Sequence, residues 1–244
     1  EVSGGKGFWR QVDREESLIH LLRVNVLKRL ESSVQSFALT VSRQLRDVEA
    51  TLARIDAKGD EVEEINIEDV DIDDPAFDGL LVGRKVKVLL SDVDLVRWRQ
   101  DLIEDRNRLS MLVSTASQVV PERDAKLAEL RRVIQEKCER PVNPGNRKVL
   151  IFTAFADTAE YLYQHLAPWA KRTLGVESAV VTGSGRNQTT IGSLRKDFGS
   201  ILTAFAPRAK ERPEEFAQEG TIDLLIGTDC ISEGQNLQDC DWLI

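Results

Sequence analysis

Three short apolar runs in the second half of the sequence each end in a threonine, and these hydroxyls are the first groups that point to chemistry. The runs end at Thr153, Thr182 and Thr228, and Gly183 follows the second of them. A hydroxyl and a backbone N–H at the end of a strand can both donate hydrogen bonds to phosphate oxygens. The pattern predicts a site for a phosphate-bearing ligand, and capping of the next helix is the alternative role for Thr182 and Thr228.

The segment after Thr228 adds groups that suit a nucleotide. From Ile226 to Gln238 it reads Ile-Gly-Thr-Asp-Cys-Ile-Ser-Glu-Gly-Gln-Asn-Leu-Gln. The glycine at position 234 would let the backbone approach a ligand closely, because it has no side chain. Asn236 offers both a donor and an acceptor to a ribose hydroxyl.

The apolar runs alternate with segments of helical periodicity, and this alternation predicts the fold class. Strands are expected over 148–153, 177–183, 222–228 and 241–244, and helices over 157–166 and 191–198. The order is typical of an α/β fold in which a parallel sheet has helices on both faces. Ligands of such sheets bind at the carboxyl ends of the strands, where the three threonines are expected to meet.

The first part of the chain, 1–145, is predicted to be a helical region, and the sheet is expected in 146–244. Apolar residues from Leu18 to Ile55 recur every three or four positions, which indicates one long helix. The predicted elements of this region are a long helix over 18–57, an acidic linker over 59–79, and helices over 94–116 and 122–138. The long helix and the helix over 94–116 are expected to pair as an antiparallel hairpin.

The segment from Ile226 to Gln238 resembles motif V of superfamily 2 helicases and translocases, in the form of the Swi/Snf-type ATPases of the bacterial RapA-like branch. Lys148–Thr158 is similar to motif IV of that family, and Val180–Gly183 is similar to the strand motif between the two. Leu27–Ser33 looks like a segment that these bacterial proteins carry just before their second lobe. The resemblance implies that 146–244 is a second RecA-like lobe, preceded by a long α-helical hairpin insertion.

The resemblance also implies a role for each motif residue. The positions implied to contact the nucleic-acid backbone are Thr153, Thr182, Gly183 and Thr228. The positions implied to lie beside ATP are Glu233, Gly234 and Asn236. ATP with Mg is the implied cofactor of the full-length protein, and the implied partners are DNA, or RNA, and the N-terminal RecA-like lobe of the same protein. No residue is assigned a catalytic or metal-binding role.

Two motifs of the family are missing from the sequence. ATP hydrolysis of this type needs a phosphate-binding loop of the form G-x-x-x-x-G-K-[S/T], and the sequence contains none. No Q-x-x-G-R-x-x-R follows position 238, so the arginine finger of the family is absent as well. We therefore expect a lobe cut before the last helicase motif. It should be inactive alone and act as an ATP-dependent helicase or translocase only in the full-length protein.

The charge and the cysteine content limit the functions that remain possible. The net charge is −8, and ten acidic residues with no basic residue fall between Gly59 and Gly79. The rest of the chain is therefore close to neutral, which leaves room for a basic surface that binds phosphates. Asp69–Asp73 imitates the start of a calcium loop, but the sixth position is Asp74 instead of glycine. Three scattered cysteines do not make a disulfide framework or a zinc site.

No apolar run is long enough to span a membrane and no secretory signal is visible, so a cytoplasmic location without membrane contact is expected. One alternative is a non-catalytic helical scaffold, whose apolar stripe along Leu18–Ile55 recruits a protein partner such as RNA polymerase. Another is a flavodoxin-like domain that binds a small molecule. It shares the alternation of strands and helices but does not account for Ser232–Gln238.

Overall fold

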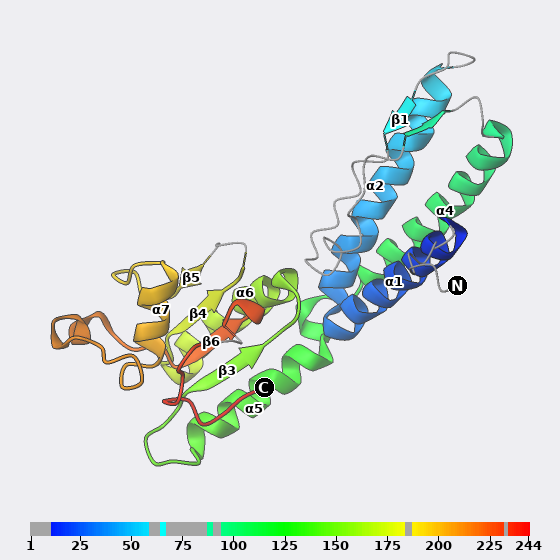
Figure 1. The fold of residues 1–244 in the computed structure, drawn as a ribbon. Coiled ribbons are helices and arrows are strands. Elements are labelled where there is room, and N and C mark those ends of the chain that lie inside the picture. Colours follow the sequence, from blue (N-terminus) through cyan, green and yellow to red (C-terminus); the bar gives the residue numbers. More distant parts are fainter. Residues whose placement is uncertain (1–10, 59–63, 67–86, 90–93, 184–186, 232–233) are drawn as a thin grey trace, which may run out of the picture. The chain divides into compact units, whose positions relative to one another are not determined.

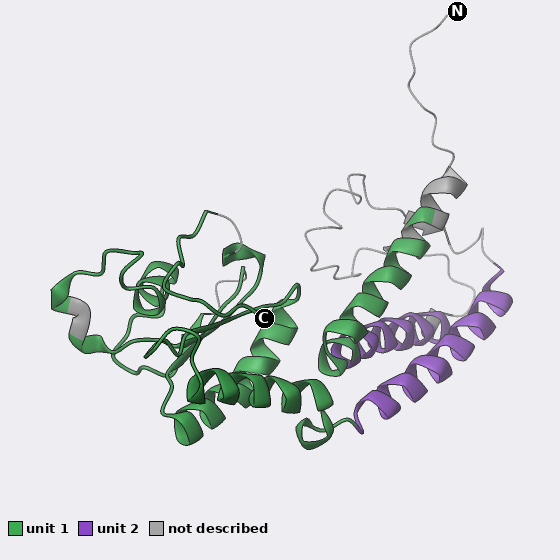
Figure 2. Ribbon diagram, turned by 90° about the horizontal axis from the view of Figure 1, so that it is seen from below, with its two compact units in different colours: residues 1–37, 119–244 green, residues 38–118 purple. Residues whose placement is uncertain are grey.

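The computed structural model describes residues 11–58, 64–66, 87–89, 94–183, 187–231 and 234–244 (Figure 1). The chain divides into two compact units, one of residues 1–37 with 119–244 and the other of residues 38–118 (Figure 2). In the part that is described, no helix combines the length and the apolar composition that crossing a bilayer requires.

The first unit contains a four-stranded sheet in the order β3-β6-β4-β5. The strands are β3 (Val149–Phe152), β4 (Ser178–Val181), β5 (Gln188–Thr189) and β6 (Leu224–Gly227). The central strand β6 is parallel to both β3 and β4, and β5 is antiparallel to β4. An isolated parallel bridge joins Leu150 to Leu243. The predicted strands around 150, 180 and 225 and their parallel arrangement are thus confirmed, whereas the short β5 was not predicted.

Helices cover both faces of this sheet, as the apolar character of the strands on both sides requires. On one face, α5 (Ala125–Glu139) and α6 (Ala156–Leu174) contribute Leu127, Ile134 and Leu166 to a core shared with Ile151, Val180 and Ile226. On the other face, α7 (Phe198–Phe205) contributes Ile201 and Phe205 to a core shared with Leu150, Val181 and Leu225. Successive strand residues alternate between the two cores, which is the side-chain period of a strand. The α/β class is therefore confirmed.

One helix prediction for this unit differs from the structure, and so does the expected end of the helical region. The helix expected over 191–198 lies instead at α7, because the Asp197 carboxylate accepts the Ser200 N–H at 2.9 Å and so caps a helix that begins at Phe198. The boundary expected at 145 also differs, since residues 119–145 belong to the unit that holds the sheet. The reason is that α5, preceded by a short turn of helix at Pro121–Arg123, packs Leu127 and Ile134 on the sheet.

The long helix expected over 18–57 is two helices, α1 (Gln11–Ser32) and α2 (Val34–Lys58). The break falls at Ser33, whose hydroxyl accepts the N–H of Ser36 at 3.0 Å. That bond satisfies an N–H in the first turn of α2, so Ser33 acts as its N-cap. The apolar spacing runs through the break unchanged, which is why periodicity alone predicted a continuous helix.

The second unit holds most of α2, the strands β1 (Glu64–Asn66) and β2 (Lys87–Leu89), and α4 (Leu95–Ala116). The two strands pair in antiparallel fashion. The Asp94 carboxylate caps α4, and Arg99 of α4 forms an ion pair of 2.7 Å with Asp56 of α2. The helix expected over 94–116 is thus confirmed. Of the acidic linker expected over 59–79, residues 64–66 form β1 and the remainder lies outside the described residues.

Candidate nucleic-acid and nucleotide interface

The carboxyl ends of the three parallel strands are aligned in one row. Phe152 of β3 and Val181 of β4 both pair with Gly227 of β6, so Thr153, Thr228 and Thr182 follow at equivalent positions. The ladder continues into this row. The Thr153 N–H donates to the Gly227 carbonyl at 3.0 Å, and the Thr228 N–H donates to the Val181 carbonyl at 3.3 Å. The structure therefore brings the three threonines together at one edge of the sheet.

The four residues predicted to bind nucleic acid differ in accessibility. Thr182 and Thr228 are only 3% and 7% exposed, and the Thr228 hydroxyl lies 3.6 Å from the Cys230 sulfur. Thr153 is half-buried and Gly183 is exposed. A Cβ added at Gly183 would have no heavy atom of the described residues within 4 Å, so no described group covers its backbone. The accessible part of the edge is thus formed by Thr153 and Gly183, and Thr182 and Thr228 lie beneath the surface.

The segment after β6 presents Gly234 and Asn236 to solvent. A short turn of helix over Asp229–Ile231 follows Thr228, and Ser232 and Glu233 lie outside the described residues. Gly234 has a φ of 69°, in the left-handed region that favours glycine, and a Cβ there would lie more than 4 Å from the heavy atoms that the structure describes around it. The side-chain oxygen of Asn236 accepts the backbone N–H of Gln238 at 3.4 Å, and Asn236 is exposed.

This segment is held by contacts that the sequence did not predict. The Asp239 carboxylate accepts the N–H groups of Arg208 and Ala209, both at 2.9 Å. The Lys210 ammonium donates to the Gln235 side-chain oxygen at 2.8 Å. Gly234 and Asn236 therefore lie on a stretch fixed to the chain that follows α7. These contacts could not be predicted from the sequence, because Asp239 and Lys210 are 29 positions apart and form no recognisable motif.

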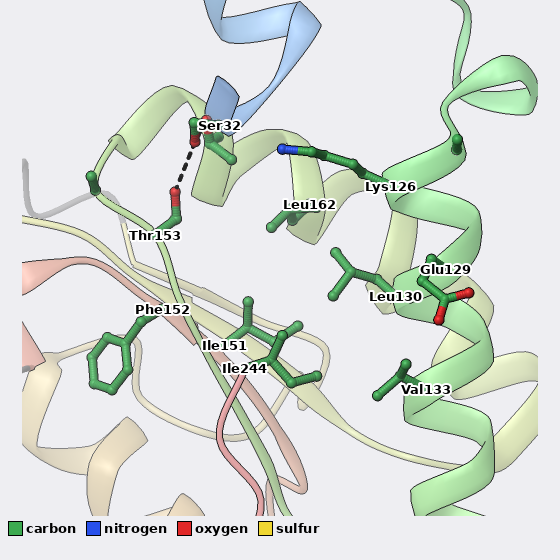
Figure 3. Close-up of a pocket in the computed structure, with 13 residues that line it drawn as sticks. Ser32, Lys126, Glu129, Leu130, Val133, Ile151, Phe152, Thr153, Leu162 and Ile244 are labelled. Carbon is green, nitrogen blue, oxygen red and sulfur yellow. Dashed lines mark hydrogen bonds between the residues drawn. The ribbon is translucent and has the colours of Figure 1, made fainter. Parts of the chain in front are cut away.

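A second unpredicted set of contacts lies beside Thr153. The Ser32 hydroxyl at the end of α1 is 3.4 Å from the Thr153 hydroxyl and 3.0 Å from the Thr158 hydroxyl (Figure 3). The Arg29 guanidinium pairs with the Asp157 carboxylate at 3.1 Å and lies 4.6 Å from the centre of the Phe155 ring. The end of α1 is thus fixed to the connection between β3 and α6. The tandem serines at 32 and 33 were the only sequence signal for a break at this point.

Next to these contacts lies a cavity of about 640 Å³ between β3, α5 and α6 (Figure 3). Its walls are mainly the aliphatic side chains of Leu130, Val133, Ile151 and Leu162, and Thr153 lies at one end. Aliphatic walls offer a nucleotide few hydrogen bonds. The groups that suit ATP, Gly234 and Asn236, do not line this cavity.

The buried ionisable groups of the first unit have surroundings typical of residues that stabilise a fold. Burial lowers the pKa of Lys148, whose ammonium donates to the Ile222 carbonyl and pairs with Asp223 at 3.3 Å. Burial raises the pKa of the Cys138 and Cys240 thiols, which keeps them in the weakly nucleophilic protonated form. Among the residues that the structure describes, no three His, Cys, Asp or Glu side chains gather closely enough to hold a metal ion.

The described strand-end row offers hydroxyls, backbone N–H groups and open space at a glycine. These groups suit the binding of an anion, whereas bond cleavage needs an activated nucleophile or a general base. No family model matches the chain, and no curated protein shows significant similarity to it.

Proposed function

We propose that the chain is the second lobe of an ATP-dependent nucleic-acid translocase of the Swi/Snf type. The observation that carries this proposal is the alignment of Thr153, Thr228 and Thr182 at the carboxyl ends of three adjacent parallel strands. Motif IV, the strand motif and motif V of the resembled family fall on the three strands of this row. The RecA-like character of the lobe and the hairpin nature of its helical insertion are part of the proposal.

The chemistry of the edge suits a sugar–phosphate backbone. Phosphodiester oxygens accept hydrogen bonds but donate none, so they need hydroxyl and N–H donors. Thr153 supplies a half-buried hydroxyl, and the exposed backbone at Gly183 lets a phosphate approach without meeting a side chain. Contacts of this kind carry no base information, so the edge would grip DNA or RNA without regard to sequence.

The nucleotide would lie on the other side of motif V. Gly234 and Asn236, together with Glu233 by resemblance, would contact ATP and its Mg in a cleft completed by the N-terminal lobe. That lobe would supply the phosphate-binding loop that this sequence lacks. Closure of the cleft would bring Gly234 and Asn236 onto the nucleotide, and opening would shift the contacts of the strand-end row along the nucleic acid.

The first test is nucleic-acid binding by the chain itself, because a single substitution can alter the strand-end edge of the sheet alone. Gly183→Ala adds a methyl group that meets no heavy atom of the described residues within 4 Å, so it should not lower stability and should obstruct an approaching phosphate. We expect affinity for fluorescein-labelled DNA, measured by anisotropy, to fall about three- to tenfold, as for one lost hydrogen bond. Gly192→Ala is the matched control, since that glycine is also exposed and its added Cβ would have none of the described heavy atoms within 4 Å. Equal affinities for the two variants would contradict the proposal.

The second test concerns ATP. Residues 1–244 alone should hydrolyse no ATP, and a protein that also carries the first lobe should do so when nucleic acid is added. In that protein Asn236→Ala should raise the KM for ATP, whereas Gly183→Ala should raise the concentration of DNA needed for stimulation. Hydrolysis by purified residues 1–244, or identical effects of the two variants, would oppose this assignment.

The scaffold alternative retains one supporting observation. In the second unit, α4 exposes apolar side chains at Val96, Met111 and Leu112, and Val96 is 83% exposed. Met111 and Leu112 are neighbours in the sequence, and exposed apolar side chains that lie together are typical of binding surfaces. If α4 recruits a protein such as RNA polymerase, Met111→Asp should weaken binding of the purified polymerase in biolayer interferometry and leave DNA affinity unchanged. Unchanged polymerase binding would oppose the scaffold role.

A further inference from the structure

The end of α1 is fixed against the connection between β3 and α6 by a buried cation. Arg29 is 9% exposed, and its guanidinium pairs with Asp157, lies against the Phe155 ring and donates to the Ser36 hydroxyl at 3.5 Å. A buried charge is stable only where partners replace its water. The contacts of Arg29 therefore hold α1 in one position relative to β3 and α6.

That position brings Ser32 onto a short chain of hydroxyl groups. The Ser32 hydroxyl lies 3.4 Å from the Thr153 hydroxyl (Figure 3) and 3.0 Å from the Thr158 hydroxyl. Thr158 is buried, Ser32 and Thr153 are half-buried, and Thr153 is the accessible hydroxyl of the strand-end row. The Thr153 oxygen also accepts the Phe155 N–H at 3.4 Å. The three hydroxyls thus run from the start of α6 to the edge of the sheet.

The number of protons in this chain decides what Thr153 can offer a ligand. Each hydroxyl has one proton to donate and two lone pairs that accept. The Phe155 N–H already occupies one lone pair of Thr153. If the Ser32 proton occupies the other, the Thr153 proton has no acceptor within the set and is directed outward. Thr158 would in turn donate to Ser32, and such chains strengthen each donor in the series.

We propose that Ser32 is a positioning residue for Thr153: it donates to the Thr153 hydroxyl and so directs the Thr153 proton to a phosphate oxygen of the nucleic acid. This inference rests on the proposed function and adds Ser32 of α1 to the residues that determine nucleic-acid binding. It also predicts the sign of the change in nucleic-acid affinity. Loss of the Ser32 hydroxyl should weaken nucleic-acid binding, because the Thr153 hydroxyl would then rotate freely and would lose the strengthening that a donor in the chain supplies.

Neighbouring serines provide matched variants for a test with the whole chain. Ser32→Ala removes the donor, and Ser32→Thr keeps it. Ser33→Ala removes the cap of α2 at the next position, because the described partner of the Ser33 hydroxyl is the N–H of Ser36. Ser33→Ala should therefore lower the free energy of unfolding without changing the affinity for DNA. Affinities for fluorescein-labelled single-stranded and duplex DNA are measured by anisotropy, and stabilities by urea unfolding.

We expect Ser32→Ala and Thr153→Ala each to weaken DNA binding about two- to tenfold, which is the range of one hydrogen bond. The double variant should bind no more weakly than Thr153→Ala alone, since Ser32 acts only through that hydroxyl. Ser32→Thr should restore most of the affinity. Ser33→Ala should bind within about twofold of the unaltered chain while unfolding at lower urea.

Failure of this inference differs from failure of the proposed function. If Thr153→Ala weakens binding but Ser32→Ala does not, or if the two effects add in full, Ser32 does not position Thr153. Tighter binding by Ser32→Ala would mean that Ser32 withholds the Thr153 hydroxyl, which also overturns the inference. If the unaltered chain binds no DNA, or if neither Thr153→Ala nor Gly183→Ala changes its affinity, the proposed function itself fails.

Discussion

Gly227, the last residue of β6, has no room for a side chain. A Cβ added there would lie 2.1 Å from Cδ1 and 2.7 Å from Cγ1 of Ile231. Non-bonded carbon atoms normally stay about 3.5–4.0 Å apart, so Ile231 would have to move by more than about 1 Å. Ile231 is only 2% exposed and packs in the core shared by β6 and α7. Overpacking of this kind costs about 1–3 kcal/mol, which we expect Gly227→Ala to lose in its free energy of unfolding.

A double variant tests the cause of that loss. Ile231→Ala alone should cost about 2–5 kcal/mol, because it leaves a cavity in the core. Gly227→Ala combined with Ile231→Ala should lose about 1–3 kcal/mol less than the sum of the two single effects, since the atoms that clash are gone.

Urea unfolding followed by circular dichroism measures all three free energies. Gly199→Ala in α7 is the control, because its Cβ would meet only the Asp197 carboxylate at an ordinary 3.5 Å, and it should gain about 0.4–1 kcal/mol. If Gly227→Ala is as stable as the unaltered chain, or if the double variant is simply additive, the packing argument for Gly227 is refuted.

Three further predictions concern buried and capping groups. Asp241→Asn should cost about 3–5 kcal/mol in a urea titration, because it leaves the fully buried Lys137 ammonium without its carboxylate, and a loss below about 1 kcal/mol would contradict this. Burial raises the pKa of Cys138 and Cys240, so at pH 7.5 both should react with iodoacetamide far more slowly in the folded chain than in guanidinium, as peptide mass mapping can show; equal rates would refute it. Asp197→Ala should cost about 0.5–2 kcal/mol at pH 7. Hydrogen bonds from Ser200 lower the pKa of Asp197, so this difference should shrink as the pH falls below about 4, and an unchanged difference at pH 2 would exclude the cap as its source.

The sheet could be predicted because its strands are apolar on both faces and end at polar residues. Leu150, Ile151 and their equivalents in β4 and β6 leave few alternatives to a buried parallel strand. Parallel strands share one carboxyl edge, so the meeting of Thr153, Thr182 and Thr228 followed from their positions alone.

The features that were missed depend on contacts between distant parts of the chain. A single hydroxyl cap at Ser33 interrupts a helix whose apolar spacing continues unchanged, and local bonds of this kind leave no trace in the periodicity. The burial of Thr182 and Thr228 depends on how other segments pack over the strand ends. The strand β5 is only two residues long, below the length at which alternation can be recognised.

The position of Ser32 and Arg29 beside Thr153 and Asp157 could not be predicted from the sequence either. More than 120 residues separate them from Thr153 and Asp157, and the ion pair and the hydroxyl contacts form only in the folded chain. The resemblance marked Leu27–Ser33 as a recognisable segment but gave no physical reason for it. The buried guanidinium and the hydroxyl chain supply one.

Hydrogen exchange followed by mass spectrometry, with and without duplex DNA, tests the central claim most directly. The claim is that nucleic acid binds at the carboxyl ends of β3, β6 and β4. DNA should slow exchange in the peptides that contain Thr153 and Gly183 and leave the peptides of α4 unchanged. Protection confined to α4, or no protection at the strand ends under saturating DNA, would contradict the claim.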